Sequence, residues 1–245
     1  MMLCCHPLVQ AETSQVIEHA VASKERPDNE VQRDKHRKPA EVLTLLGVKA
    51  GMKVADFSSG GGYYTDILSR IVGEQGMVVA HNTPYVINRF AQFLDDPKQG
   101  WLSRLNSPQW RKNVVKNVQE LDTIELPLQL DAALMVLFYH DTVWQGVNRD
   151  MMNRRIFNAL KPGGAYLIID HNAKEGSKLN DVSTFHRIDK KHVIDEISKV
   201  GFVLDTDSTL LSNPDDKRDY NFTRDATSKR DQTDRMVLKF IKPFK

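Results

Sequence analysis

The sequence predicts an α/β fold in which a doubly wound, mostly parallel sheet ends in an antiparallel pair of strands. Short apolar runs alternate with amphipathic helical segments between residues 53 and 169, which is the pattern of strand–helix–strand crossover units. The run Ala132–Phe138 is apolar at every position, as expected of a strand covered on both faces. No helical pattern separates the last two strand-like runs, 202–211 and 236–241, so these runs are expected to pair antiparallel at one edge.

The individual elements follow from local patterns. Residues 41–46 are expected to form a short helix, and glycines at 47 and 51 turn the chain into a strand at 53–57. The next helix is indicated by apolar residues that recur at helical spacing: Tyr64, Ile67, Leu68, Ile71 and Val72. Further strands are expected at 77–80, 113–118 and 165–169, and further helices at 85–94, 152–160 and 190–200.

Length and composition suit one such domain with an N-terminal extension. The chain has 245 residues, of which 40% are hydrophobic and 27% charged, and it is long enough to bury a sizeable core. Residues 1–40 are predicted to form a polar extension that is helical or partly disordered, and residues 41–245 the domain. The charged part of the extension is interpreted as a solvated helix or linker, with a substrate lid as the alternative.

Charge and targeting signals limit the partners and the location. With 34 basic and 32 acidic residues the net charge is +2, which favours a small-molecule substrate over a nucleic acid. No apolar run approaches membrane-spanning length, so no membrane partner is expected. Cytoplasmic localisation is predicted; a truncated export signal is the alternative, because Val9-Gln10-Ala11 resembles a cleavage site but no basic segment precedes it. The sequence does not indicate an oligomeric state.

Three consecutive glycines mark the candidate binding site. They follow the strand that contains Asp56, and a helix begins directly after them. This order of strand, glycine turn and helix N-terminus is typical of nucleotide-type sites, because backbone N–H groups face a ligand that no Cβ obstructs. A simple tight turn is the alternative reading of glycines alone.

Two classes of cofactor compete for this loop. A dinucleotide fingerprint would run G-x-G-x-x-G, but Thr65 stands where the third glycine should be, which counts against NAD. Asn82, at the end of the second strand, stands where a side chain that binds ribose is expected in either class.

Three further features resemble the class I S-adenosylmethionine-dependent methyltransferases. Asp56–Gly62 resembles their motif I, Leu160–Gly164 resembles the turn before their fifth strand, and the closing strand pair resembles their edge hairpin. The resemblance implies a seven-stranded Rossmann-like methyltransferase fold and transfer of a methyl group from S-adenosylmethionine to a small molecule. It implies contacts to this cofactor from seven residues: Asp56, Ser58, Gly60, Gly61, Gly62, Asn82 and Tyr139.

The sequence looks closest to a bacterial group of predicted methyltransferases to which the resemblance assigns no particular substrate. The match includes Phe138-Tyr139-His140-Asp141 and Asp170-His171. Two residues depart from the superfamily pattern, since Ser58 replaces the first glycine of motif I and Asn82 replaces the acid that binds the ribose hydroxyls. A non-catalytic S-adenosylmethionine-binding protein is therefore an alternative, and an NAD-dependent oxidoreductase a weaker one.

Ionisable residues follow two neighbouring strands at the expected ligand edge. His140, Asp141, Asp170 and His171 should converge there, because ligands bind beyond the carboxyl ends of parallel strands. His140 is predicted to accept a proton from the acceptor, with Asp141 or His171 orienting it; the alternative is a histidine that caps nearby backbone. His186 is a further catalytic candidate after the fifth strand. No metal is predicted, although Asp141, Asp170 and Asn172 could supply oxygen ligands.

Overall fold

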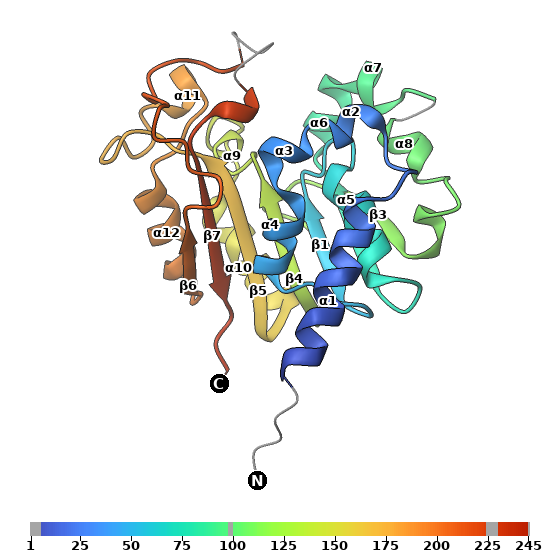
Figure 1. Ribbon diagram of the computed structural model, residues 1–245. Helices are drawn as coiled ribbons and strands as arrows, with labels where there is room; N and C mark the ends of the chain where they lie inside the picture. Colours follow the sequence, from blue (N-terminus) through green and yellow to red (C-terminus); the bar gives the residue numbers. More distant parts are fainter. Residues whose placement is uncertain (1–5, 98–99, 224–229, 245) are drawn as a thin grey trace.

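A single seven-stranded sheet forms the centre of the molecule (Figure 1). The structure is a computed structural model that describes residues 6–97, 100–223 and 230–244. The strand order is β3-β2-β1-β4-β5-β7-β6. The strands are β1 (Lys53–Phe57), β2 (Met77–Asn82), β3 (Val114–Val118), β4 (Leu130–Val136), β5 (Leu160–His171), β6 (Val203–Ser208) and β7 (Arg235–Ile241).

The first five strands are parallel and β7 is antiparallel to both β5 and β6. The predicted fold class, with its antiparallel edge pair, is confirmed. The fifth strand is longer than the predicted 165–169, because the Lys161–Gly164 segment continues the strand instead of forming a separate turn. Gly163 has a φ of +77° there, and its N–H donates to the carbonyl of Lys242 at 2.7 Å. The sixth strand is shorter than predicted and ends at Ser208.

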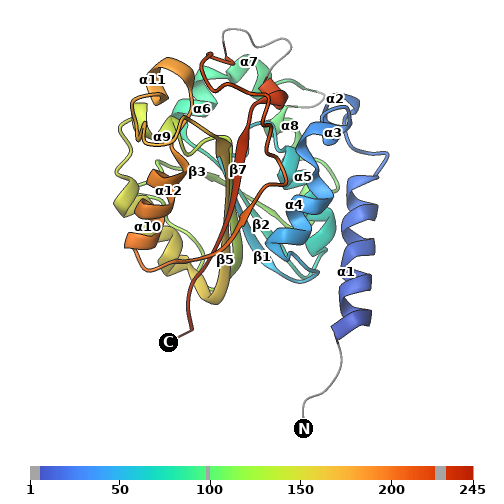
Figure 2. The same ribbon diagram turned by 60° about the vertical axis from the view of Figure 1, so that its left-hand side comes forward.

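Helices cover both faces of the sheet. Figure 2 shows α1, α4 and α5 on one face and α10 and α12 on the other. The longer helices are α1 (His6–Val21), α4 (Pro39–Leu46), α5 (Tyr63–Val72), α10 (Arg149–Ala159) and α12 (Lys190–Lys199). The short ones are α2 (Asp28–Val31), α3 (Asp34–Arg37), α6 (Pro84–Arg89), α7 (Ala91–Leu94), α8 (Trp101–Arg104), α9 (Asp141–Trp144) and α11 (Val182–Phe185), with single 3-10 turns at Trp110–Lys112 and Arg230–Gln232. None of the helices in the described ranges is long and apolar enough to span a bilayer.

The helix predicted at 85–94 is interrupted at Phe90. Phe90 has a φ of −115°, which is outside the helical range, and it separates α6 from α7. Thr83 begins α6 as its N-cap, because its hydroxyl accepts a hydrogen bond from the N–H of Val86 at 3.2 Å. The break places the ring of Phe93 beside Gly61, as described below.

The N-terminal segment packs against the sheet domain. Ile17 and Ala20 of α1 are buried with Val42 of α4 and with apolar residues of α5. After α1 the chain runs through α2 and α3 at the end of the sheet where the parallel strands finish (Figure 1). Residues that follow the strands and residues from the N-terminal segment therefore meet at the carboxyl edge of the sheet.

Candidate functional site

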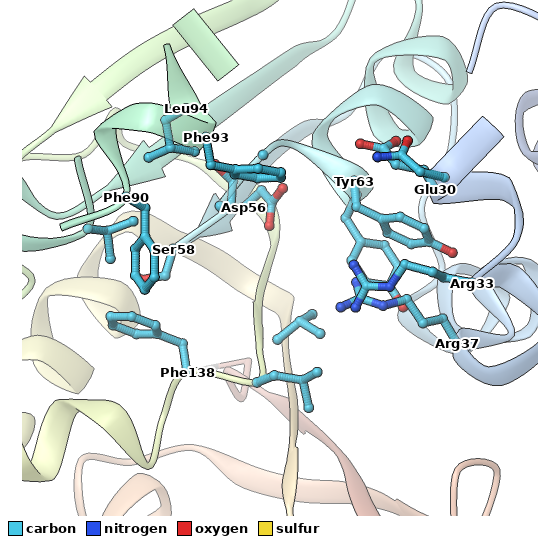
Figure 3. A pocket seen from close by; sticks show the side chains of 18 of the residues that line it. Glu30, Arg33, Arg37, Asp56, Ser58, Tyr63, Phe90, Phe93, Leu94 and Phe138 are labelled. Carbon is cyan, nitrogen blue, oxygen red and sulfur yellow. The ribbon is translucent and has the colours of Figure 1, made fainter. Parts of the chain in front are cut away.

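A cavity of about 420 Å³ lies at this carboxyl edge, between the β1–α5 loop and the N-terminal helices. The backbone and side chains of Ser58, Ser59, Gly60 and Gly61 form its floor. Figure 3 shows that its two sides differ in character. One side carries the apolar side chains of Phe90, Phe93, Leu94 and Phe138, and the other carries Glu30, Arg33, Arg37 and Tyr63.

The three glycines of the loop are required for three different reasons. Gly60 has a φ of +56°, and a Cβ there would meet nothing within 4 Å, so it leaves space in the cavity. A Cβ on Gly61 would lie 3.1 Å from Phe93. A Cβ on Gly62 would lie 2.2 Å from Trp110, and Gly62 also has a φ of +91°. Gly60 therefore keeps the floor open for a ligand, Gly61 permits the close approach of Phe93, and Gly62 permits close packing of a tryptophan.

Ser58 stands at the position where the resembling motif has a glycine, and its backbone keeps the glycine-like conformation. Its φ is +51°, in the left-handed region that non-glycine residues seldom adopt. The hydroxyl groups of Ser58 and Ser59 are buried and have no hydrogen-bond partner within the described part of the chain. Buried hydroxyl groups are normally paired. Two unpaired ones on the floor of a cavity fit a polar ligand that supplies the missing partners.

Asn82 lies beneath the glycine loop and not on the cavity wall. It is fully buried. Its Oδ1 accepts a hydrogen bond of 2.9 Å from the N–H of Gly60, and its Nδ2 donates one of 3.1 Å to the Gly60 carbonyl. Both polar groups of the amide are used by the backbone. The expected contact to a ribose does not agree with this geometry, in which Asn82 holds the loop in place.

Asp56 reaches the cavity from the end of β1. Burial raises the pKa of Asp56 to about 7, although the hydroxyl of Thr65 donates a hydrogen bond of 2.6 Å that acts in the opposite direction. The same contact gives Thr65 a structural role at the position where a dinucleotide fold would have glycine. A carboxyl group with this pKa changes charge readily near neutral pH, for example when a cationic ligand approaches it.

The N-terminal residues of the cavity were not predicted as site residues. Glu30 and Arg33 come from the segment containing α2, and Arg37 ends α3. Burial and the neighbouring charge of Arg33 lower the pKa of Arg37. This charged segment was interpreted above as a solvated helix or linker, with a substrate lid as the alternative. In the structure it forms one wall of the cavity. The only indication in the sequence was the high density of arginine and acidic residues at 26–37. The spacing of apolar residues in helices does not indicate that this segment lies beside Gly60.

His140 and the acids around it do come together, but in an arrangement that differs from the predicted one. The ring Nδ1 lies 2.7 Å from Oδ1 of Asp170, and the ring Nε2 lies 3.1 Å from Oδ1 of Asp141. Burial alone would lower the pKa of His140, but these two carboxylates raise it to about 10. The protonated ring cannot accept a proton at neutral pH. The role of His140 as a base therefore conflicts with its surroundings.

The remaining candidates divide between the cavity and the interior. Asp141 and Phe138 line the cavity. His186 lies at its margin, where Nδ1 is 3.4 Å from Oδ1 of Asp141. His171 is buried, and its Nδ1 lies 2.6 Å from the hydroxyl of Thr233. It is thus not placed to orient His140, whose Nδ1 is held by Asp170.

Tyr139 points away from the cavity. It is fully buried, and its hydroxyl donates a hydrogen bond of 2.9 Å to Oε2 of Glu196 and accepts one of 2.9 Å from Nδ2 of Asn153. These partners belong to α12 and α10, which lie on the face of the sheet opposite α1, α4 and α5. The expectation that Tyr139 contacts the cofactor does not agree with this placement, whereas Tyr63 and Tyr64 do line the cavity.

Parts of the sequence are similar to those of known methyltransferases. Residues 31–92 match the protein-L-isoaspartate(D-aspartate) O-methyltransferase family, and this range contains both Arg37 and the glycine loop. The ubiquinone/menaquinone biosynthesis C-methyltransferase UbiE of Idiomarina loihiensis is 28% identical over 147 residues, which are 59% of this chain. The match spans only about half of that relative's length, 53%.

Solved structures share the fold at low sequence identity. A SAM-dependent methyltransferase from Aquifex aeolicus aligns with a TM-score of 0.54 and 19% identity over 85% of this chain and 98% of its own. The cyclase SpnF aligns with a TM-score of 0.58 and 12% identity over 97% of this chain and 96% of its own.

The fold and the glycine loop define an α/β protein of the kind that binds a nucleoside-containing cofactor at the carboxyl edge of its sheet. Together with these similarities, they place the chain in the class I S-adenosylmethionine-dependent methyltransferase superfamily.

Proposed function

We propose that this protein binds S-adenosylmethionine in the cavity over Gly60 and transfers its methyl group to a small molecule. The observation that carries the proposal is the open floor at Gly60, combined with the unpaired hydroxyl groups of Ser58 and Ser59. A bare backbone and two free hydroxyls suit a ligand that is polar where it meets the loop.

The two unlike sides of the cavity match the two unlike ends of this cofactor. The guanidinium groups of Arg33 and Arg37 would attract the carboxylate of its amino-acid portion. Asp56 would then face the ammonium group, and a positive charge there would favour the ionised carboxyl. The rings of Phe90 and Phe93 would cover the adenine on the opposite side.

The acceptor would approach along Phe138 and Asp141, which line the cavity at the end of β4. When bound, S-adenosylmethionine supplies an activated methyl group on a sulfonium, so the protein mainly has to align the reactants and exclude water. Phe138 and Phe90 would exclude water, and Asp141 would orient a polar group of the acceptor. A small molecule suits a cavity of about 420 Å³, and the net charge of +2 provides no strong overall positive field that would favour nucleic acid.

A protein that binds S-adenosylmethionine without transferring its methyl group is the second candidate. One arrangement favours it: the carboxylates of Asp170 and Asp141 lie 2.7 and 3.1 Å from the ring nitrogens of His140 and raise its pKa to about 10, which does not suit a base at neutral pH. An NAD-dependent oxidoreductase is less consistent with the site, because Thr65 is buried where a third glycine would be required.

Calorimetry with S-adenosylmethionine, S-adenosylhomocysteine and NAD tests the cofactor. We expect the first two to bind and NAD not to bind, and binding of NAD alone would refute the proposal. Turnover is tested by the release of S-adenosylhomocysteine with a panel of small phenols, hydroquinones, thiols and amines. Hydroquinones are included because the UbiE relative is described as acting in ubiquinone and menaquinone biosynthesis. Binding without release for the whole panel would favour the non-catalytic candidate.

A further inference from the structure

His140, Asp141 and His186 offer three ligand atoms that all lie within 4.8 Å of one another. Nε2 of His140 is 3.1 Å from Oδ1 of Asp141, and Nδ1 of His186 is 3.4 Å from the same oxygen. Ligand atoms bound at about 2.0–2.2 Å to one ion lie about 3.0–3.5 Å apart at tetrahedral or octahedral angles. Two of the three separations in this cluster are thus already in the range that a bound ion requires.

We propose that these three residues form a binding site for a divalent transition-metal ion of the Zn²⁺ type. Two imidazoles and one carboxylate are a ligand set that suits such ions, and three protein ligands leave positions open for an exogenous oxygen. The inference rests on the proposed function, because the ion would hold an oxygen of the methyl acceptor beside the cofactor cavity.

The neighbours of the cluster support this assignment independently of the ligands. Nδ1 of His140 is held at 2.7 Å by Asp170, whose side chain is fully buried, so that Nε2 is aimed at Asp141. Metal-binding histidines are commonly oriented by a carboxylate in this way. Nε1 of Trp144 donates a hydrogen bond of 2.7 Å to Oδ1 of Asp141, which fixes the carboxylate. Both protein ligands that follow β4 are therefore held by groups outside the cluster.

Burial leaves the cluster closed on one side and open on the other. The side chain of His140 is 3% exposed, whereas those of Asp141 and His186 are 21% and 27% exposed. Phe222 packs against the rings of His140 and His186, at centroid distances of 6.3 and 6.2 Å. Asp141 itself lines the cofactor cavity, so the open side faces the place where the acceptor would bind.

A metal site would also explain why a histidine occupies position 186, where the backbone has a positive φ. This residue is the C-cap of α11 and has a φ of +53°, a conformation that favours glycine or asparagine. A histidine held in this conformation places its ring beside Asp141. The substitution His186→Asn therefore keeps the backbone preference while it removes the imidazole.

The test measures metal binding and cofactor binding separately on the whole chain. Metal-free protein is titrated with Zn²⁺ by calorimetry, and with Co²⁺ by its visible absorption, at pH 8 because a proton competes with the metal for Nε2 of His140. We expect one ion per chain, and we expect His186→Asn to weaken its binding at least about tenfold. The control is His192→Asn, which removes a half-buried histidine that is paired with Glu196 on α12 and should leave metal binding unchanged.

Three outcomes would overturn the inference: no stoichiometric ion in the wild-type protein, equal affinity in His186→Asn and the wild type, or equal losses in the two variants. Circular dichroism of each variant shows whether it is folded. S-adenosylmethionine binding is measured on the same samples with and without Zn²⁺. Cofactor binding without metal binding would refute the metal site and leave the proposed function intact, whereas metal binding without cofactor binding would refute the proposed function.

Discussion

Asn82 and Gly60 exchange two hydrogen bonds, one from the Gly60 N–H to Oδ1 and one from Nδ2 to the Gly60 carbonyl, at 2.9 and 3.1 Å. A buried side chain at the end of β2 thus determines the shape of the loop after β1. An amide can do this because it carries a donor and an acceptor, whereas an aspartate in the same place has only acceptors.

Asn82→Asp should therefore destabilise the protein even though an acid is usual at this position in the resembling enzymes. The new carboxylate oxygen would face the Gly60 carbonyl and leave it without a donor, at a cost of about 1–3 kcal/mol. Urea unfolding measures this cost. The exposed Asn106 provides the control Asn106→Asp, which should change the free energy of unfolding by less than about 0.5 kcal/mol. Unchanged stability in Asn82→Asp would show that the loop does not depend on the amide.

Gly60→Ala should separate stability from ligand binding. The added methyl group meets no protein atom within 4 Å, and Gly60 lines the cavity, so the methyl group would occupy space that a ligand needs. Gly47 has a φ of +81° in the left-handed region, and a Cβ there also meets nothing within 4 Å. Both alanine variants should lose about 1–2 kcal/mol of stability because of the left-handed backbone. Only Gly60→Ala should abolish S-adenosylmethionine binding in calorimetry. Equal affinity in the two variants would show that the cofactor does not bind at this loop.

Gly62→Ala should affect packing. Its Cβ would lie 2.2 Å from Trp110, so the indole must move, and we expect a loss of about 2–4 kcal/mol in the free energy of unfolding. The Gly47→Ala variant again shows the cost of the left-handed backbone alone, because Gly47 and Gly62 have similar φ and ψ angles. Adding Trp110→Leu to Gly62→Ala should cost less than Trp110→Leu costs in the wild type, because the smaller side chain also relieves the clash with the new methyl group. Additive effects in this double-mutant cycle would contradict the predicted contact.

The pKa of Asp56 predicts a dependence of stability on pH. Burial raises this pKa from 3.8 to about 7 in the folded protein. Between these values the folded state holds a proton that the unfolded state has lost, so the contribution of Asp56 is full below pH 3.8 and falls as the pH rises towards 7. The slope is about 1.4 kcal/mol per pH unit at most. Urea unfolding of the wild type and Asp56→Asn at pH 5–8 should show the difference in stability shifting in favour of the variant as the pH rises, whereas parallel curves would exclude this assignment.

Arg37→Met should weaken S-adenosylmethionine binding without unfolding the protein. The substitution keeps much of the side-chain volume. It also removes an ion pair of 3.7 Å with Asp231, but Asp231 keeps its two hydrogen bonds from Arg33, so no charge is left unpaired. If Arg37 holds the cofactor carboxylate, the affinity should fall by about 10–100-fold. Methylthioadenosine lacks the amino-acid portion, so its affinity should stay the same. The exposed pair formed by Arg154 and Asp150 supplies the control Arg154→Met. If Arg37→Met weakened the binding of S-adenosylmethionine and methylthioadenosine equally, Arg37 would not contact the amino-acid portion of the cofactor.

The spacing of apolar residues along the sequence was sufficient to predict most of the fold. Strand β4 was recognisable because seven consecutive apolar residues require cover on both faces, and the antiparallel edge followed from the missing helix. The break between α6 and α7 was missed because the spacing of apolar residues continues through Phe90. The extent of β5 was missed because Pro162 and two glycines are typical of a turn.

The site was predictable only in part, for a physical reason. The glycine loop is local in sequence, so its strand–turn–helix pattern could be read directly. The contacts of Asn82, Tyr139 and His140 depend on which face of the sheet each side chain meets and on partners such as Asp170 and Glu196. Such pairings are set by tertiary packing, and residue type alone gives both a ligand-binding and a structural interpretation.

The wall formed by α2 and α3 connects distant parts of the chain. Arg33 forms two hydrogen bonds of 3.1 Å to Asp231, and Arg235 donates one of 2.8 Å to the carbonyl of His36. A shortened chain that starts at Glu41 would retain all seven strands but lose this wall and its arginines. The same truncation would remove α1 and expose the apolar faces of α4 and α5 that now cover Ile17 and Ala20. The first forty residues thus contribute to the core as well as to the wall, and their removal would impair both.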